Sequence, residues 1–592
     1  VPPQSITVEA GVVKHAASKR QAGFGELAAA ASTQPVPTDI KLKAPADFKL
    51  IGNATLPRVD TPSKTDGTAI FTQDIKLPGM LVAVPLHPPH FGATVKSVDA
   101  TKAKRIPGVV QVVRFSGDAF RFEGVAVLAT NTWAAKQGRD ALKVEWDDSK
   151  AYKQGTPQLL EQYRAAAAHP GKIATKIGNV DTALAAPTGK LIEADYEMPY
   201  LAHAAMEPMN CLVKLDGHTC EIWNGEQFQT VDQQQVGKFL GIAPEQVRIH
   251  QLFAGGSFGR RANPHSDYVL EAVAIARAAR AMNVKVPIKM VWMREDDMRG
   301  GYYRPLNLHR ARIALDSKGN INAWHVRLVG QSVMTGTLFE SMMKNGVDPT
   351  SVEGLADLPY DIPNLQIEAT IPEGARVPIQ WFRSVGHSHT AFSSEGLIDE
   401  AAVLAGRDPV AYRLGLLDKQ PRYRGVLQLA ADKAQWSQPL PAGANGERRG
   451  RGVAVHNAFD TYVAQVAEIT VRKDGSLKVD RVVCAVDCGK VVNPDIIKAQ
   501  MEGGIGFALG VALHGAITLK DGVVEQSNFN DYQVLRMDEM PRVEVYIVAS
   551  TEKPTGVGEP GVPPLAPAVV NAIYNAVGKR LRKLPIADQL TA

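Results

Sequence analysis

Beyond about residue 190, short apolar runs alternate with turns that contain Asp and Gly. Asp-Gly between alternating apolar residues is a strong signal for a β-hairpin. Helical periodicity separates these runs at 266–282 and 396–417. This alternation of hairpins and helices predicts a large α+β body. The predicted hairpins lie at 212–223, 311–329, 464–483 and 516–526.

The rest of the pattern divides the chain into further segments. Residues 1–63 combine an Ala-rich helical pattern with a Pro-punctuated linker, and 64–150 carry the apolar runs of a small α/β domain. A polar, Ala-rich connection at 151–190 follows. The α+β body is expected as two similar halves, 191–440 and 441–592, with a shared site at their interface.

Composition restricts the functional class. With 45% hydrophobic and 21% charged residues, the 592-residue chain is typical of a multidomain globular protein. Its formal net charge of +5, without a Lys/Arg-rich block, gives no support for nucleic-acid binding. The least charged stretch, 503–519, is short and contains His514, so it predicts a buried helix running into a strand and no membrane span.

Four cysteines occur, and none form C-x-x-C. An iron–sulfur or zinc site on this chain is therefore not expected, because such sites draw several thiolates from tight spacings. Small buried hydrophobes are the default interpretation for all four. A disulfide between Cys211 and Cys220 stays open for an oxidising compartment. The cysteines are Cys211, Cys220, Cys484 and Cys488.

The stretch P-T-G-V-G-E-P-G, residues 554–561, matches the dinucleotide pattern G-x-G-x-x-G. Glu559 sits among the glycines as a competing anion, and neighbouring prolines remove backbone donors, so a phosphate cradle is disfavoured. What remains is one carboxylate on a stiff loop before an apolar helix that contains Leu565 and Ile573. It is either a loop-bracing carboxylate or a positioned general base.

Two further stretches combine glycine, aromatic and basic residues. Residues 254–261, A-G-G-S-F-G-R-R, follow a strand-like run and can present backbone N–H groups to an anion, or form only a tight turn. Residues 380–390, Q-W-F-R-S-V-G-H-S-H-T, are loop-like. A metal site at His387 and His389 lacks further spaced ligands and is disfavoured.

Two other groups are weaker candidates. His203 and Glu207 have the spacing to share one face of a helix, where a structural hydrogen-bonded pair is favoured over metal binding. The stretch 487–504 follows a strand and turns at Asn493-Pro494 into a helix. Gln500 on that helix either points its amide into a pocket or is exposed.

Together and in this order, these motifs resemble the large subunit of the molybdenum hydroxylase family, which includes xanthine oxidase and aldehyde oxidoreductase. The nearest likeness is to isoquinoline 1-oxidoreductase β-subunits and similar bacterial aldehyde dehydrogenases, and it covers nearly the whole chain. The resemblance implies an α/β hammerhead domain followed by two large molybdenum-cofactor-binding α+β domains. It also implies oxidation of an aldehyde, or hydroxylation of an N-heteroaromatic ring with oxygen from water. A non-catalytic homologue or assembly subunit is the alternative.

The resemblance also assigns roles to residues. Glu559 is the base beside a molybdenum held by a pyranopterin dithiolene, with no protein side chain as metal ligand. Gln227 hydrogen-bonds an oxygen on the metal, and Gln500 binds the pterin. The cofactor-binding backbone comprises Gly255, Gly256, Ser257, Phe258, Gly259, Phe382, Arg383 and Gly558.

Departures from the family pattern narrow these expectations. Ala262 and Ser351 stand where purine hydroxylases carry Glu and Arg, and the S-V-G-H-S-H loop lacks the Cys of carbon monoxide dehydrogenases. Xanthine and CO are therefore not the expected substrates. The family's G-Q-G cofactor segment is missing, and the chain starts at Val1 without a signal core.

The expected partners follow from the resemblance. A small subunit with 2Fe–2S clusters would accept the electrons, and a separate N-terminal polypeptide would supply G-Q-G. A cytochrome c is a candidate final acceptor, and the pterin is expected in its cytosine dinucleotide form. The expected location is the periplasm, or the periplasmic side of a bacterial membrane, in preference to the cytoplasm.

Overall fold

The computed structural model describes residues 1–118 and 121–591, in two compact units, Val1–Asn53 and Ala54–Ala592. The first unit is an antiparallel sheet of β1 (Ile6–Glu9), β2 (Val12–His15) and β3 (Arg20–Gly23), followed by α1 (Phe24–Ala31). The helical prediction for this region is wrong over the three strands. Ala10 and Gly11, at φ 49° and 76°, form the turn of a hairpin between two β-branched runs, and only the Ala-rich part is helical.

In the second unit, a seven-stranded mixed sheet has the order β13-β12-β11-β14-β4-β7-β6. Strands from the predicted small domain pair directly with strands from the first half, since β4 runs parallel to β14. Helix α7 (Asp267–Ala281) covers one face and α3 (Thr132–Asp140) the other, because adjacent residues of β4 and β7 enter separate apolar clusters. The hammerhead assignment stays a prediction. The strands are β4 (Leu81–Leu86), β6 (Val109–Phe115), β7 (Gly124–Ala129), β11 (Asn210–Asp216), β12 (Thr219–Asn224), β13 (Val247–Gln251) and β14 (Ile288–Val291).

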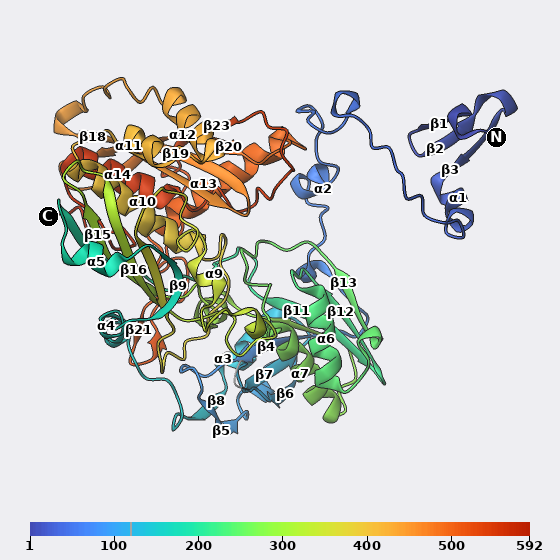
Figure 1. The fold of residues 1–592 in the computed structure, drawn as a ribbon. Helices are drawn as coiled ribbons and strands as arrows, with labels where there is room; N and C mark the ends of the chain where they lie inside the picture. Colours follow the sequence, from blue (N-terminus) through green and yellow to red (C-terminus); the bar gives the residue numbers. More distant parts are fainter. Residues whose placement is uncertain (119–120, 592) are drawn as a thin grey trace. The chain divides into compact units, whose positions relative to one another are not determined.

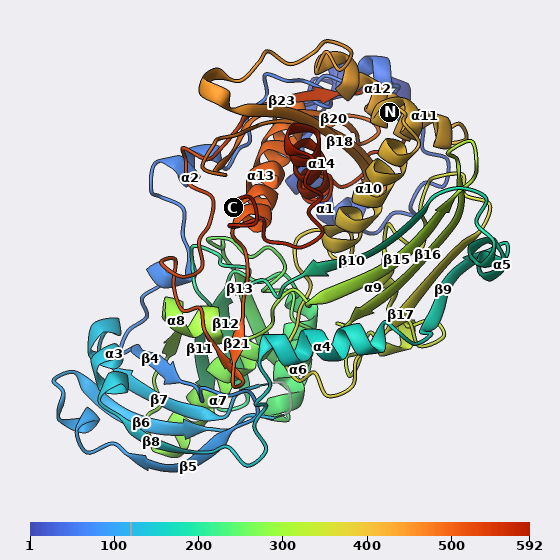
Figure 2. The same ribbon diagram turned by 90° about the vertical axis from the view of Figure 1, so that its left-hand side faces the viewer.

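A five-stranded sheet, ordered β10-β15-β16-β17-β9, belongs to the first half of the body. Figure 2 shows α10 (His387–Leu404) and α4 (Thr156–Ala166) on opposite faces of this sheet. Ile313 contributes to the main core on one face, and its neighbour Ala314 packs with α5 (Val180–Ala185). The strands are β9 (Lys172–Ile177), β10 (Leu191–Met198), β15 (Asn307–Leu315), β16 (Ile321–Gly330) and β17 (Leu365–Thr370).

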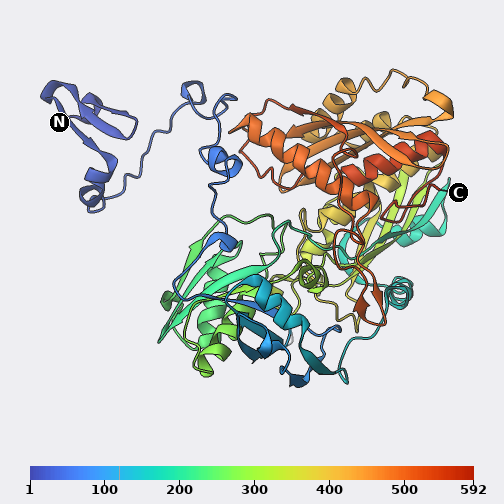
Figure 3. The same cartoon turned by 180° about the vertical axis from the view of Figure 1, so that it is seen from behind.

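The second half is built on a four-stranded sheet, ordered β18-β19-β20-β23. Helices α12 (Pro421–Lys433) and α14 (Leu565–Val577) cover its two faces (Figure 1). Helix α13 (Pro494–Leu513) runs beside α14 (Figure 3). The strands are β18 (Arg448–Ala458), β19 (Thr461–Val471), β20 (Leu477–Asp487) and β23 (Arg542–Ile547).

Smaller elements complete the second unit. They are α2 (Thr61–Thr65), α6 (Gln229–Leu240), α8 (Arg294–Arg299), α9 (Pro349–Val352), α11 (Pro409–Leu416), β5 (Thr94–Asp99), β8 (Lys143–Asp147), β21 (Leu519–Lys520) and β22 (Val523–Val524).

All four predicted hairpins form, as β11–β12, β15–β16, β19–β20 and β21–β22. The predicted helix at 396–417 is corrected. It starts earlier, at His387, and is interrupted where Gly406 takes φ 67° and Asp408 caps α11 by accepting from two backbone N–H groups. The cysteines are free and buried, so no Cys211–Cys220 disulfide is present among the described residues.

Helix α13 is the buried helix that the sequence predicts at 503–519, and β21 follows it. Asn493 caps it by accepting from the Ile496 N–H at 3.1 Å. Its length and composition alone suit a membrane span, with 44% of its apolar window buried. Met501, Ile505 and Leu509 lie in the main hydrophobic core, as in a core helix of the body.

Candidate active site

The loop that carries Glu559 meets the turn after Arg383, although 175 positions separate the two segments. The Ser384 N–H donates to Glu559 Oε1 at 2.9 Å, and Ser384 Oγ donates to the Glu559 carbonyl at 2.7 Å. Within the described chain no hydrogen bond engages Glu559 Oε2. One carboxylate oxygen is therefore fixed while the other stays free, as a positioned base requires.

The turn that holds Glu559 is strained. Ser384 and Val385 adopt φ values of 77° and 47°, the left-handed region that non-glycine residues rarely occupy. Such conformations persist only where the surrounding structure enforces them, and they cluster at functional sites. In this conformation the turn directs the Ser384 N–H toward the Glu559 carboxylate.

Arg383 fastens the same loop one residue earlier. Its guanidinium donates to the Gly558 carbonyl at 2.8 and 2.6 Å, and to Gln500 Oε1 at 3.1 Å. This clamp joins the Glu559 loop to α13. The Arg383 side chain also lies over the ring of Phe507, at 5.6 Å.

The G-G-S-F-G loop follows β13 and is held by the side chain of Glu207. Gly256, Phe258 and Gly259 take φ values of 100°, 59° and 107°, which turn the backbone sharply. The Glu207 carboxylate accepts from the Gly255 N–H at 2.7 Å.

Aromatic contacts bring this loop to the same place as the other segments. Phe258 packs on Phe507 of α13 at 4.7 Å, and Phe382 packs on the same ring at 5.1 Å. The loop from the first half, the turn before α10 and a helix from the second half thus converge. A site between the halves is what the sequence predicts.

Gln227 is exposed two residues before the start of α6, and its amide oxygen accepts from the Ser257 hydroxyl of the glycine loop. Behind it, the neighbouring Glu226 is buried, and burial raises the pKa of its carboxyl. Burial also raises the pKa of Asp232, close beside it. The two acids interact, so a proton is retained in this pair at neutral pH.

His203 and Glu207 do not share a helical face, because residues 203–207 are not helical. His203 Nε2 instead donates to the Trp381 carbonyl, 2.7 Å away, and burial lowers the pKa of His203 to about 3. Each residue braces a different loop, His203 that of Trp381 and Glu207 that of Gly255, so the predicted pairing is wrong while the structural role holds. His387 and His389, expected in a loop-like stretch, instead lie in the first turn of helix α10, where they contact His456 and His309.

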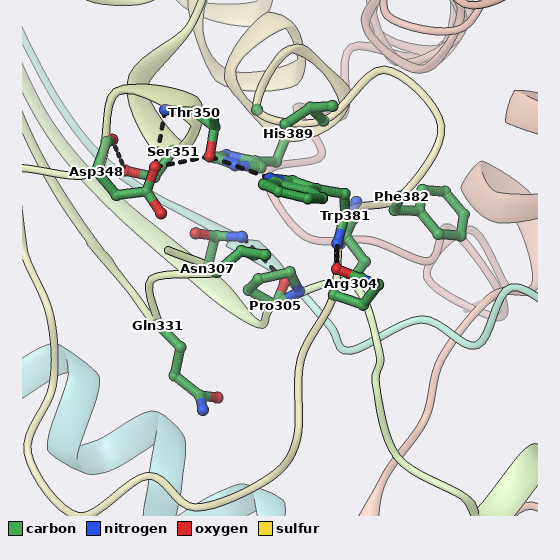
Figure 4. A pocket seen from close by; sticks show the side chains of 14 residues that line it. Arg304, Pro305, Asn307, Gln331, Asp348, Thr350, Ser351, Trp381, Phe382 and His389 are labelled. Carbon is green, nitrogen blue, oxygen red and sulfur yellow. Dashed lines mark hydrogen bonds between the residues drawn. The ribbon is translucent and has the colours of Figure 1, made fainter. Parts of the chain in front are cut away.

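A narrow pocket of about 20 Å³ borders Phe382 and Val385 (Figure 4). Figure 4 shows the Trp381 ring beneath Thr350 and Ser351. Trp381 Nε1 donates to Thr350 Oγ1 at 3.4 Å, and Ser351 Oγ donates to the Asp348 carbonyl at 2.7 Å. Ser351 therefore offers the pocket no charge.

The residues at the junction fit a pterin-borne metal. A Cβ on Gly556 would meet nothing within 4 Å, and one on Gly558 only Gln500 Oε1 at 3.9 Å, so this loop faces open space. The amides of Gln227 and Gln500 supply hydrogen-bonding groups. Within residues 1–118 and 121–591, no three His, Cys, Asp or Glu side chains gather as a metal site.

Sequence reasoning missed Ser384 and Phe507, which connect the predicted segments. Ser384 directly follows Arg383 in the W-F-R-S motif, so its position was visible, but neither Ser nor Val signals a left-handed turn. Phe507 lies two turns beyond Gln500 on α13, on the same side of the helix, which is the signal that helical spacing offers.

Comparison with known proteins identifies the family. Residues 165–415 and 418–541 match molybdopterin cofactor-binding domains. The chain is 31% identical to the isoquinoline 1-oxidoreductase subunit beta of Brevundimonas diminuta, over 100% of this chain and 79% of that protein. It is 32% identical to a membrane-bound aldehyde dehydrogenase (pyrroloquinoline-quinone) of Gluconacetobacter polyoxogenes, over 99% of this chain and 78% of that protein.

Solved structures share the fold. Quinoline 2-oxidoreductase from Pseudomonas putida 86 superposes with a TM-score of 0.77 at 15% identity, covering 91% of this chain and 97% of that one. The aldehyde oxidoreductase from Desulfovibrio gigas gives 0.73 at 17% identity, covering 96% and 83%. The α+β prediction is confirmed. The chain belongs to the molybdenum hydroxylase family of xanthine oxidase and aldehyde oxidoreductase, as the large subunit of a molybdenum-dependent oxidoreductase.

Proposed function

We propose that this subunit oxidises an aldehyde, or hydroxylates an N-heteroaromatic ring with oxygen from water, using Glu559 as the general base. The observation that carries this role is the Ser384–Glu559 contact, which fixes Oε1 and leaves Oε2 to accept a proton. When bound, the molybdenum cofactor supplies two-electron redox chemistry and activates water. The non-catalytic alternative is not favoured, because the relatives are oxidoreductase subunits.

The remaining residues orient the cofactor and the base. Gln227 and Gln500 contribute their amides as hydrogen-bonding groups, and the glycine loop brings backbone N–H groups close. Arg383 holds the Gly558 carbonyl and so sets the position of the next residue, Glu559. The cofactor is proposed in its cytosine dinucleotide form.

The substrate is proposed to be an apolar aromatic aldehyde or an isoquinoline-like ring. Phe228, directly after Gln227, lies 6.0 Å from both Phe339 and Trp381. These rings form an apolar surface, while Ala262 and Ser351 offer no charge to a purine. A purine edge would lose hydrogen-bond partners there, which costs affinity. Benzaldehyde and isoquinoline should therefore be oxidised in preference to xanthine.

Electrons are proposed to leave to a separate 2Fe–2S subunit, with a cytochrome c beyond it. The four cysteines of this chain are buried and dispersed, whereas two clusters need about eight thiolates. A further polypeptide is proposed to supply the absent G-Q-G segment. A periplasmic location completes this proposal, and fractionation of the native cells tests it.

The experiment that tests the function is Glu559→Gln, which keeps the Ser384 hydrogen bond but removes the base. A general base contributes roughly 10²–10⁴ in rate. The variant should lose at least about 100-fold in kcat per molybdenum while keeping its metal content. Turnover near that of the wild type would disprove the assignment.

A further inference from the structure

Arg261 lies two residues after the glycine loop, and its side chain is fully buried. The guanidinium reaches the end of β12, where Nη1 donates to Asn224 Oδ1 at 3.1 Å and to the Gly225 carbonyl at 3.3 Å. Its Nη2 donates to Glu207 Oε2 at 3.4 Å. One side chain thus joins the strand end that leads to Gln227 with the carboxylate that braces the glycine loop.

The main chain of Arg261 reaches Gln227 by a second route. Its N–H donates to Ser257 Oγ at 3.0 Å, and the Ser257 hydroxyl donates to Gln227 Oε1. The side chain of Arg261 meanwhile holds Gly225, which lies two residues before Gln227. These contacts close a ring that runs from Arg261 through Ser257 and Gln227 to Gly225 and back. The amide of Gln227 is therefore fixed both through its own segment and through its oxygen.

This ring determines which end of the Gln227 amide is occupied. A hydroxyl that accepts an N–H still has its own proton to donate, and Gln227 Oε1 receives it from Ser257. Within the described chain no hydrogen bond engages Gln227 Nε2. Its two N–H groups are thus left as donors for a ligand, and they can bind only an acceptor, such as an oxygen on the cofactor's metal.

The contacts of Arg261 require a guanidinium. This group spreads five N–H donors in a rigid plane and can hold acceptors from two segments at once, whereas a lysine ammonium is a compact charge on a flexible stem. The adjacent Arg260 is also buried, but its side chain forms a bidentate pair with Asp267 on α7, at 2.9 and 2.6 Å. Among the described contacts, only Arg261 of the two hydrogen-bonds the segment before Gln227 through its side chain.

We propose that Arg261 is a positioning residue that sets the orientation of the Gln227 amide. This inference rests on the proposed contact of Gln227 with the cofactor. Without the guanidinium, Gly225 is released, and the Ser257 contact alone no longer prevents the amide from flipping. A flipped amide presents its oxygen in place of its nitrogen, so an acceptor on the cofactor loses its donor and faces a second acceptor.

The test compares Arg261→Lys with Arg260→Lys, a matched control in which an adjacent buried guanidinium becomes an ammonium. Crystal structures should show the Ser257–Gln227 hydrogen bond lost in Arg261→Lys and kept in Arg260→Lys. In the purified molybdenum-containing complex, Arg261→Lys should lower kcat per molybdenum by about 10- to 100-fold and alter the electron paramagnetic resonance signal of the metal. Arg260→Lys should leave both unchanged.

A double substitution shows whether the effect passes through Gln227. Residues that act through one contact are not additive, so Arg261→Lys combined with Gln227→Leu should be no slower than Gln227→Leu alone. Ser257→Ala removes only the hydroxyl of the ring and should lower kcat by a similar factor. This smaller change keeps the test available if Arg261→Lys does not fold.

Three results would overturn the positioning role. They are an intact Ser257–Gln227 hydrogen bond in Arg261→Lys, rate losses that multiply in the double variant, and an unchanged kcat and resonance signal in Ser257→Ala. Full activity of Gln227→Leu would instead refute the proposed contact of Gln227 with the cofactor, while the crystal structures would still report whether Arg261 orients the amide.

Discussion

Arg383 offers a direct test of whether loop positioning governs the chemistry. Its guanidinium holds the Gly558 carbonyl through two contacts of 2.8 and 2.6 Å, and Gln500 through one of 3.1 Å. Substitution to Met keeps the length and apolar stem of the side chain and removes all three. Glu559, the next residue after Gly558, then depends on the Ser384 contacts and on the turn in which its carbonyl accepts from the Val562 N–H at 3.0 Å.

The size of the effect follows from these contacts. A hydrogen bond from a charged donor is worth about 1.5–3 kcal/mol, and the pair to one carbonyl counts once. Since the side chain is only partly buried, about 2–4 kcal/mol of positioning energy is at stake. A displacement of about 1 Å costs roughly 10²-fold in rate, or about 2.7 kcal/mol. We expect kcat per molybdenum to fall about 100-fold.

A matched control exists on the surface. Arg407 also donates to one backbone carbonyl, that of Lys318 at 2.7 Å, and to one side-chain amide oxygen, that of Asn320 at 3.0 Å. Arg407→Met should leave kcat unchanged. Steady-state rates at saturating aldehyde, normalised to molybdenum content, compare the two variants. If Arg383→Met keeps its rate within about twofold, the clamp does not position the base.

Two further predictions concern stability and loading. Gly259, at φ 107°, leaves no room for a side chain, because a Cβ there would lie 2.4 Å from the Trp381 carbonyl. Gly259→Ala should therefore lower the folding stability by about 1–3 kcal/mol and reduce the molybdenum content. The control Gly406→Ala, at φ 67° with nothing within 4 Å of the new Cβ, has the backbone strain without the clash and should keep its metal. Equal molybdenum in both would contradict this. Because burial raises the pKa of Glu226, the folded chain binds a proton that the unfolded chain releases, so stability falls as pH rises above about 4.3 toward the raised value. Glu226→Gln should flatten the fall of Tm over this range, and an unchanged slope would exclude Glu226 as its source.

Local turn chemistry explains which elements could be predicted. The four hairpins, whose turns contain Asp and Gly, depend on residues close together in sequence, so their turns encode them. The start of α10 at His387 could not be found in this way, because its first turns carry buried polar residues in place of an apolar stripe. The strands at 6–23 were missed because their alternation is short and the adjacent Ala-rich run dominated the pattern.

The candidate site was predictable as a set of segments and not as a set of contacts. Motif order alone indicated the glycine loop, the W-F-R-S segment and the Glu559 loop. The Ser384–Glu559 bond joins residues 175 positions apart and depends on a left-handed turn that Ser does not signal. Glu207 was noticed for its spacing from His203, while its carboxylate binds Gly255 and Arg261, which lie 48 and 54 positions away. Such pairings arise only when the sheets and helices have packed.

The same packing fixes the distance between the loop that carries Glu559 and the turn at Ser384 that binds its carboxylate. The Ser384 turn leads into α10 and the Glu559 loop leads into α14, and these helices contact each other. Glu395 on α10 is fully buried and accepts from Arg413 at 2.9 Å and from the Val455 N–H at 3.0 Å. Its carbonyl accepts from Asn571 of α14 at 3.4 Å. The Arg413–Glu395 pair joins α10 to α11, and breaking a buried pair of this kind costs about 3–5 kcal/mol, so α10 is firmly held in the core. The starts of both helices, and with them the Ser384–Glu559 contact, are therefore held in place before any substrate arrives.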